Sequence, residues 1–167
     1  GRLMKIPTTP TSAPMLALSE YASRALRKSL PPAVAERARL HLLDTFAAII
    51  SGTRLLPGER ARQYVKSLGG RPEAGVMGTR IVTSAQYAAL ANGMCGHADE
   101  TDDTHPPTRS HPGTAIVPAA LAIAERNRLS GRALLRAMVL GYDVSARVVF
   151  ACAPKPVTST YGHCLLY

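Results

Sequence analysis

Apolar residues recur along most of this sequence at intervals of three and four positions, which is the spacing of amphipathic helices. In the first part of the chain, the residues that share one such face are Leu18, Tyr21, Ala22 and Ala25. They predict a helix that runs to about Lys28. The preceding residues 1–12, GRLMKIPTTPTS, lack this spacing and are predicted to form a flexible N-terminal arm.

Breaks and wider apolar stripes predict the remaining elements. Pro31 and Pro32 end the first helix, because proline is tolerated only in the first turn of a helix. The stripes that follow predict helices over about residues 33–51, 59–68, 84–94, 115–124 and 132–151. Gly52 is expected to be the C-terminal stop of the first of these. Residues 75–82, GVMGTRIV, are predicted to be extended, either as a short hairpin or as a connection.

The predicted fold class is therefore all-α, a compact array of helices, but it looks incomplete. Residues 115–124 are apolar on nearly every side, which predicts a helix that is buried all round. A handful of helices supplies little cover for such a segment. The chain also starts at Gly1 and ends on apolar residues 165–167. We expect it to be a fragment of a longer chain, a truncated product or one subunit of a split enzyme.

Length and composition are those of a soluble globular domain. The chain has 167 residues, of which 46% are hydrophobic and 19% charged. Its longest apolar run, residues 116–124, is too short to cross a bilayer, so no membrane partner is expected. The three cysteines have no CxxC spacing, and residues 1–15 do not resemble a signal peptide. A cytoplasmic location is predicted.

The net charge of +9 raises the question of a nucleic-acid partner. The basic residues are scattered, with no run of four or more. The chain has no Trp and only two Phe, so aromatic stacking platforms are scarce. We therefore predict no nucleic-acid partner.

The chemistry-bearing residues gather in one segment, HADETDDTHPPTRSHPG. Four of the eleven acidic residues and three of the five histidines fall there: Asp99, Glu100, Asp102, Asp103, His97, His105 and His111. Crowded carboxylates repel one another, which favours raised carboxyl pKa values, and imidazoles exchange protons near pH 7. The residues alone leave three interpretations: a metal-free acid/base site, a divalent metal site, or a solvated acidic loop that caps helices.

One metal-dependent alternative has a specific spacing. Asp99, Asp102 and Asp103 lie at i, i+3 and i+4, which could place them on one helical face. Aspartates at this spacing are similar to the motifs with which helical prenyl-diphosphate enzymes hold magnesium. The second motif that such enzymes need is not visible.

The same segment resembles the MmgE/PrpD family, which carries NG, then H-A-x-D-x-D-D-T-H and H-P. The matching positions here are Asn92-Gly93, His97-Ala98, Asp102-Asp103-Thr104-His105 and His111-Pro112. Further matches are Leu43-Asp44-Thr45, Ser130-Gly131, Gly141-Tyr142-Asp143 and Arg147. The resemblance covers about residues 16–150. It implies the large helical domain of that fold, without the smaller lid domain, so residues 13–167 would be the N-terminal portion of that domain.

The resemblance also implies roles for individual residues. His111 is our first choice for the acid/base group, with Asp102 and Asp103 to orient it or share protons. Thr104 would donate to a substrate carboxylate, and Arg109 could pair with one or neutralise the loop. His97 and His105 are secondary substrate-binding candidates. The family's first aspartate aligns with Glu100, whereas Asp99 falls where an apolar residue is usual, so either could take that catalytic role.

The function implied is lyase chemistry on a small polycarboxylate such as 2-methylcitrate or aconitate, by dehydration, decarboxylation or an epimerisation. The resemblance implies a homodimer and no metal or other cofactor. Family members are more than twice as long and draw further groups from later sequence, so this chain alone would hold about half of a composite site. The competing interpretation is a truncated, non-catalytic helical domain that only dimerises.

Overall fold

The computed structural model describes residues 11–152, which form six helices and one short hairpin. The helices are α1 (Ala13–Ala25), α2 (Pro32–Gly52), α3 (Leu56–Leu68), α4 (Ala85–Gly96), α5 (Pro112–Arg126) and α6 (Gly131–Cys152). The hairpin pairs β1 (Ala74–Gly75) with β2 (Val82–Thr83) in antiparallel register. The predicted helical class is confirmed. Residues 1–10 of the predicted arm and residues 153–167 lie outside the described part.

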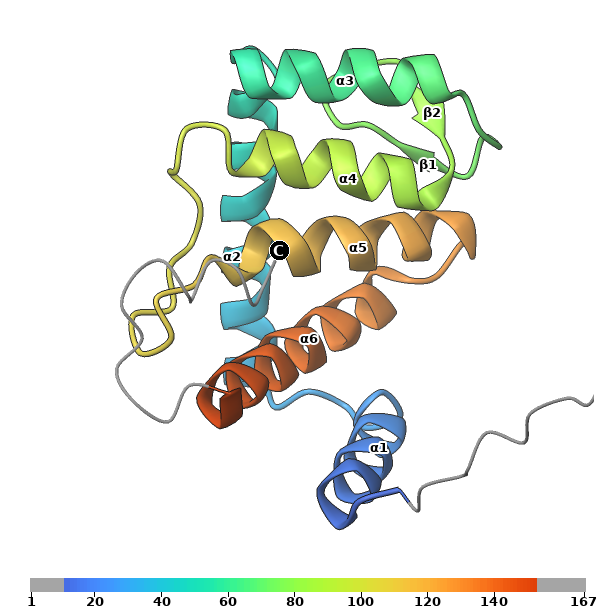
Figure 1. Cartoon of the computed structure of the whole chain (residues 1–167). Coiled ribbons are helices and arrows are strands. Elements are labelled where there is room, and N and C mark those ends of the chain that lie inside the picture. The colour runs from blue at the N-terminus through green and yellow to red at the C-terminus, as the bar shows by residue number, and fades with distance from the viewer. Residues whose placement is uncertain (1–10, 153–167) are drawn as a thin grey trace, which may run out of the picture.

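The helices form a stack that crosses one long helix. In Figure 1, α3, α4 and α5 run side by side, and α2 crosses behind them. Helix α6 packs against α5 and α2, and α1 contacts α6. The loop of residues 97–111, which carries the acidic segment, leaves the end of α4 and returns to the start of α5 beside α2.

Local sequence sets most helix ends. Pro32 occupies the first turn of α2, as predicted, and Gly69, with a φ of 68°, ends α3. The Ser130 hydroxyl accepts a hydrogen bond from the Ala133 amide at 3.3 Å and caps α6. Helix α1 ends three residues before the predicted Lys28, because the chain unwinds through a tight turn before the two prolines.

Two small-residue cores hold the stack together. The first joins α3, the hairpin, α4 and α5 through Ala61, Val65, Ala74, Val76, Ala85, Ala88, Ala91 and Ala122. The second joins α2, α5 and α6 through Ala38, Val117 and Met138. The many alanines let the helix axes approach closely, so the ends of α4 and α5 and the middle of α2 converge where the acidic loop begins.

The prediction that α5 is buried all round is wrong for the described residues. Val117 and Pro118 are buried, but Ile123 is 40% exposed. Helices α4, α6 and α2 and strand β1 contact α5, and within residues 11–152 they leave Ile123 open to solvent.

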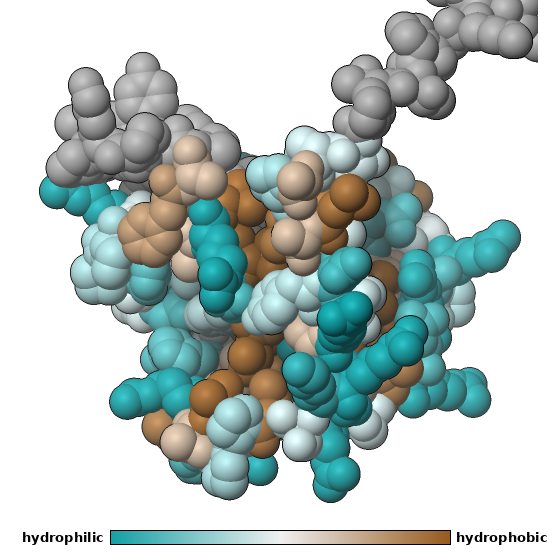
Figure 2. Space-filling model, turned by 90° about the horizontal axis from the view of Figure 1, so that it is seen from below, coloured by the Kyte–Doolittle hydropathy of each residue, from teal (hydrophilic) through white to brown (hydrophobic). Residues whose placement is uncertain are grey.

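Apolar side chains also remain on the surface seen from below the view of Figure 1 (Figure 2). An apolar groove of about 350 Å³ lies between α2 and α6, with Val34, Ala38, Met138 and Val139 in its walls. Within residues 11–152, no helix has the length and apolar character needed to cross a membrane.

Gly52 ends α2 as predicted, but for a different reason. Its successor Thr53 keeps a right-handed helical conformation, so Gly52 is not a left-handed cap. A Cβ on Gly52 would lie 1.8 Å from the carbonyl oxygen of Cys95 and 3.0 Å from the Cβ of Ala98. The absence of a side chain lets the end of α2 touch the end of α4, directly before the acidic loop.

Gly52→Ala should therefore destabilise the fold, by about 3 kcal/mol, because the backbone of α4 must move to admit the methyl group. Gly131→Ala is the matched control, since a Cβ at that helical position meets nothing within 4 Å. The control should lie within about 1 kcal/mol of wild type. Urea unfolding followed by circular dichroism measures both, and equal stabilities would contradict the close approach.

Candidate active site

The loop of residues 97–111 is held in a defined shape by its own hydrogen bonds. The His105 amide donates to the Ser110 carbonyl at 2.8 Å, and the buried Thr108 and Ser110 hydroxyls lie 2.7 Å apart. Glu100 and Arg109 have positive φ values of 53° and 52°, which turn the chain sharply at two points. The loop thereby folds back and places its centre against α2.

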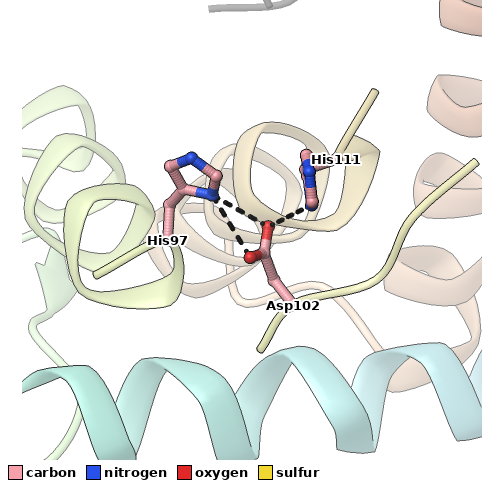
Figure 3. A group of neighbouring side chains, drawn as sticks. All are labelled: His97, Asp102 and His111. Atoms are coloured by element: carbon pink, nitrogen blue, oxygen red, sulfur yellow. Dashed lines mark hydrogen bonds and ion pairs between the residues drawn. The ribbon is translucent and has the colours of Figure 1, made fainter. Parts of the chain in front are cut away.

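Asp102 lies at the centre of the site, between two histidines from opposite ends of the loop (Figure 3). Its side chain is completely buried. The Nδ1 atom of His97 lies 3.2 Å from both carboxylate oxygens, and the Nδ1 atom of His111 lies 3.3 Å from Oδ2. The imidazole rings are 5.1 Å apart between centroids and inclined at 60°. The structure thus brings together three of the predicted site residues.

This arrangement determines which ring nitrogens can do chemistry. An ionised carboxylate only accepts hydrogen bonds, so Nδ1 of His97, which lies within hydrogen-bond distance of Asp102, carries the proton in this contact. The lone pair of a neutral His97 ring then sits on Nε2. His111 places its Nδ1 beside the same carboxylate.

The same three residues are also a candidate metal centre. His97, Asp102 and His111 each offer one ligand atom, and these atoms lie within 4.8 Å of one another. Two imidazoles and one carboxylate form a donor set that suits zinc or manganese better than magnesium. The prediction that the protein needs no metal stays a prediction.

Asp103 points into a different network. Its Oδ1 accepts a hydrogen bond from the Gly113 amide at 2.8 Å. Its Oδ2 accepts one from the Tyr142 hydroxyl at 2.6 Å and lies 3.2 Å from Nδ1 of His41. The carboxylate is only 6% exposed and joins α2, α5 and α6 at one point. Adjacent aspartates therefore serve two separate clusters.

The Asp103 contact also caps a helix. His111 is the N-cap residue of α5, yet its own side chain makes no capping hydrogen bond. The Asp103 carboxylate supplies that bond at the second residue of the helix, Gly113, where a negative charge is favourable. A Cβ on Gly113 would lie 2.6 Å from Asp103 Oδ1 and 2.7 Å from the Thr45 hydroxyl, so only glycine fits there.

The sequence analysis did not predict every member of the network around Asp103. Asp143 and Arg147, which lie at i and i+4, form an ion pair at 3.0 Å. Tyr142 itself points to Asp103, and its ring lies 5.6 Å from that of His41. Burial, reinforced by the hydrogen bond to the Asp103 carboxylate, raises the pKa of the Tyr142 phenol strongly. The Gly141-Tyr142-Asp143 motif was the available signal, whereas His41 had none.

The other predicted residues lie around the two clusters. Asp99 accepts hydrogen bonds from Ser51 and Thr101, and the Thr101 hydroxyl is the main cause of its lowered pKa. Nδ1 of His105 lies 2.6 Å from the Thr108 hydroxyl, within the loop. Among the predicted site residues, Glu100, Thr104 and Arg109 are exposed on the loop surface. Their predicted roles in substrate binding or catalysis need a partner surface outside the described residues.

Two clefts reach the site from different sides. A cleft of about 640 Å³ between α4 and α5 includes His97, Met94 and Thr114 in its walls. A smaller one of about 330 Å³ is bordered by His105 and Tyr142. His97 therefore borders a space large enough for a small acid.

The fold and this site define a helical domain of a known enzyme family. Residues 16–165 match the MmgE/PrpD N-terminal domain, and the chain belongs to that family. This confirms the resemblance read from the motif between Asn92 and Pro112.

Several curated relatives are similar to most of the chain. It is 34% identical over 122 residues to the human cis-aconitate decarboxylase, which is 70% of this chain and 25% of that protein. It is 27% identical over 148 residues to the cis-aconitate decarboxylase-like protein oryM of Aspergillus oryzae, covering 84% and 31%. It is 26% identical over 152 residues to a cis-aconitate decarboxylase of Aspergillus terreus, covering 88% and 31%.

These comparisons identify the chemistry of the chain at the level of the family. Family membership and the decarboxylase relatives link the chain to dehydratase and decarboxylase chemistry in general. The chain spans only 25% to 31% of the length of these relatives. A specific activity is therefore a matter for proposal.

The raised pKa of Tyr142 predicts a missing step in a tyrosine titration. At a pH of about 10.5, exposed phenols ionise, while the Tyr142 phenol stays protonated in the folded protein. The rise in absorbance at 295 nm should be equal for wild type and Tyr142→Phe when folded. In urea, wild type should gain one tyrosinate more than the variant. A smaller rise in the folded variant would contradict the assignment.

The sign of the effect on stability follows from the same shift. Because the pKa is raised in the folded state, the unfolded chain loses the phenol proton first as pH rises. The Tyr142 phenol therefore stabilises the fold below about pH 10, and this contribution declines above that pH.

Proposed function

We propose that this chain is the N-terminal part of a lyase that acts on a small polycarboxylate. The observation that carries the proposal is the buried Asp102 carboxylate between the Nδ1 atoms of His97 and His111. A carboxylate between two imidazoles beside a cleft suits proton transfer, because the carboxylate orients the rings that carry the proton.

His111 is the proposed general acid/base. Its Nε2 takes the carbon-bound proton next to a substrate carboxylate, and the carbanion is stabilised by that carboxylate. In a dehydration, the electron pair forms the C=C bond while the C–O bond breaks, and an acid protonates the departing hydroxyl. In a decarboxylation, no carbon-bound proton is removed first: the C–C bond to a carboxylate breaks and carbon dioxide leaves. The electron pair that remains on carbon takes a proton from a His111 ring that starts in the imidazolium form.

The exposed residues of the loop are proposed to meet the substrate. Thr104 and Arg109 can donate to its carboxylates, and a guanidinium can bind two oxygens at once. Glu100 and Asp99 stay the two candidates for the family's first acidic position. Glu100, Thr104 and Arg109 are exposed and Asp99 is half-buried, so we propose that further sequence or a second copy of the chain closes over them.

Exposed apolar surface supports this composite site. Leu43 of α2 is 66% exposed, Leu56 of α3 is 63% exposed, and Ile123 of α5 is 40% exposed. Burial of such surface stabilises association, so a homodimer that includes the later sequence fits the domain better than an isolated monomer. The partner proposed is thus a second copy of the complete protein.

The names of the relatives suggest which acid to test first. Three are decarboxylases or decarboxylase-like proteins of cis-aconitate. We propose a turnover screen of the complete protein that starts with cis-aconitate and continues with 2-methylcitrate and other di- and tricarboxylates. Release of carbon dioxide, formation of a double bond and inversion at carbon distinguish the three reaction types.

His111→Ala in the complete protein should lower kcat by about 1,000-fold, because the proton acceptor is lost, while the helical circular dichroism is retained. Arg39→Ala is the control, since Arg39 is exposed on α2 and pairs only with Glu36. The control should keep wild-type turnover. Near-normal activity of the His111 variant would remove that residue from the mechanism.

A chelator test separates the two kinds of chemistry that the cluster allows. Treatment of the complete protein with EDTA, followed by gel filtration, should leave turnover unchanged if the imidazoles act as proton carriers. Metal analysis of the treated protein by mass spectrometry is the control for removal. Loss of turnover that zinc or manganese restores would instead assign His97, Asp102 and His111 as metal ligands. The predicted magnesium motif is wrong, because Asp99, Asp102 and Asp103 lie in a loop, not on one helical face, and contact different partners.

A further inference from the structure

We propose that Asp103, Tyr142 and His41 form a positioning unit that holds His111 in place, and that Asp103 does not itself carry the transferred proton. The inference rests on the proposed role of His111. It assigns a function to His41 and Tyr142, which the sequence motif left without one. The unit acts on the backbone of His111, whereas Asp102 acts on its ring.

At the start of α5, the side chain that caps the helix is not that of the N-cap residue. An N-cap residue usually accepts a hydrogen bond from the helix with its own side chain. The His111 imidazole faces Asp102 and makes no such bond. The Asp103 carboxylate accepts from the Gly113 amide instead, at 2.8 Å. The His111 imidazole cannot both cap α5 and face Asp102. Because the Asp103 carboxylate caps the helix, the imidazole stays available for chemistry.

Side chains from two other helices hold Asp103 in place. The Tyr142 hydroxyl of α6 donates to it at 2.6 Å, and Nδ1 of His41 of α2 lies 3.2 Å away. Both of these contacts are to Oδ2, and the Gly113 amide occupies Oδ1, so both oxygens of this carboxylate, which is 6% exposed, have partners. An acceptor saturated in this way is well placed to hold a backbone, and poorly placed to exchange a proton with substrate.

The start of α5 fits closely against these side chains. The Thr45 hydroxyl, the Tyr142 hydroxyl and Asp103 Oδ1 all lie within 3 Å of where a Gly113 Cβ would be. The start of α5 therefore sits directly on the unit, two residues after His111. Any loss from the unit lets this helix end move. A misplacement of about 1 Å can lower the rate of a proton transfer by roughly 100-fold.

The test compares two tyrosine variants of the complete protein. Tyr142→Phe removes the hydroxyl that donates to Asp103 and should lower kcat by roughly 10- to 100-fold, with KM within about two-fold. Tyr21→Phe is the matched control, because the Tyr21 hydroxyl also bonds an aspartate of α6, Asp143, but outside the site. The control should retain wild-type kcat. Wild-type kcat in Tyr142→Phe, or a raised KM with unchanged kcat, would overturn the proposal.

Substitutions of Asp103 distinguish positioning from proton transfer. Asp103→Asn keeps an acceptor for the Gly113 amide but removes the charge, whereas Asp103→Ala removes the cap. If the unit positions His111, the asparagine variant should be about 10-fold more active than the alanine variant. Equal loss in both variants would show that Asp103 acts through its charge or its proton, and the proposal would be wrong.

A spectroscopic measurement that needs no turnover tests the positioning unit independently of the proposed function. In nitrogen-15 histidine spectra of the complete protein, Tyr142→Phe should move the His111 ring signals, and Tyr21→Phe should leave them in place. If no polycarboxylate is turned over but the His111 signals move, the proposed function fails and the positioning unit stands. Unmoved His111 signals in a folded Tyr142→Phe variant would refute the unit, whatever the substrate.

Discussion

Burial of two adjacent carboxylates is the constraint on which the rest of this domain depends. A charge removed from water must be compensated by close partners, or the fold loses several kcal/mol. Asp102 meets this requirement with two imidazoles, and Asp103 with a backbone amide, a phenol and a third imidazole. Because Asp102 and Asp103 are consecutive, their side chains must point into different surroundings to reach these partners. The loop, the start of α5 and the crossing of α2 are all arranged around that pair.

The packing of small residues makes this arrangement possible. Gly52 brings the end of α2 onto the end of α4, and Gly113 brings the start of α5 onto Asp103. Alanines fill the core between α3, α4 and α5. Close helix contacts leave little freedom at the helix ends, so the acidic loop is anchored on rigid elements. Histidines held by such supports keep the orientation that proton transfer requires.

The helices were predictable because each depends on local pattern. Apolar spacing, Pro32 and Gly69 act over a few residues, and the structure confirms the elements that they predict. The exception is α5, whose apolar surface predicted full burial, since pattern alone does not say whether the covering elements belong to the same chain. Within the described residues, Ile123 stays 40% exposed.

The sequence by itself determined the helical class, the family and the segment that holds the chemistry, because these follow from local spacing and from residue types in a fixed order. Only the tertiary structure decided that Asp102 and Asp103 serve different clusters, and that His41 and Tyr142 belong to one of them. Those contacts join residues 39 and 62 positions apart, and partners at such separations are set by how the helices cross, which no local pattern encodes.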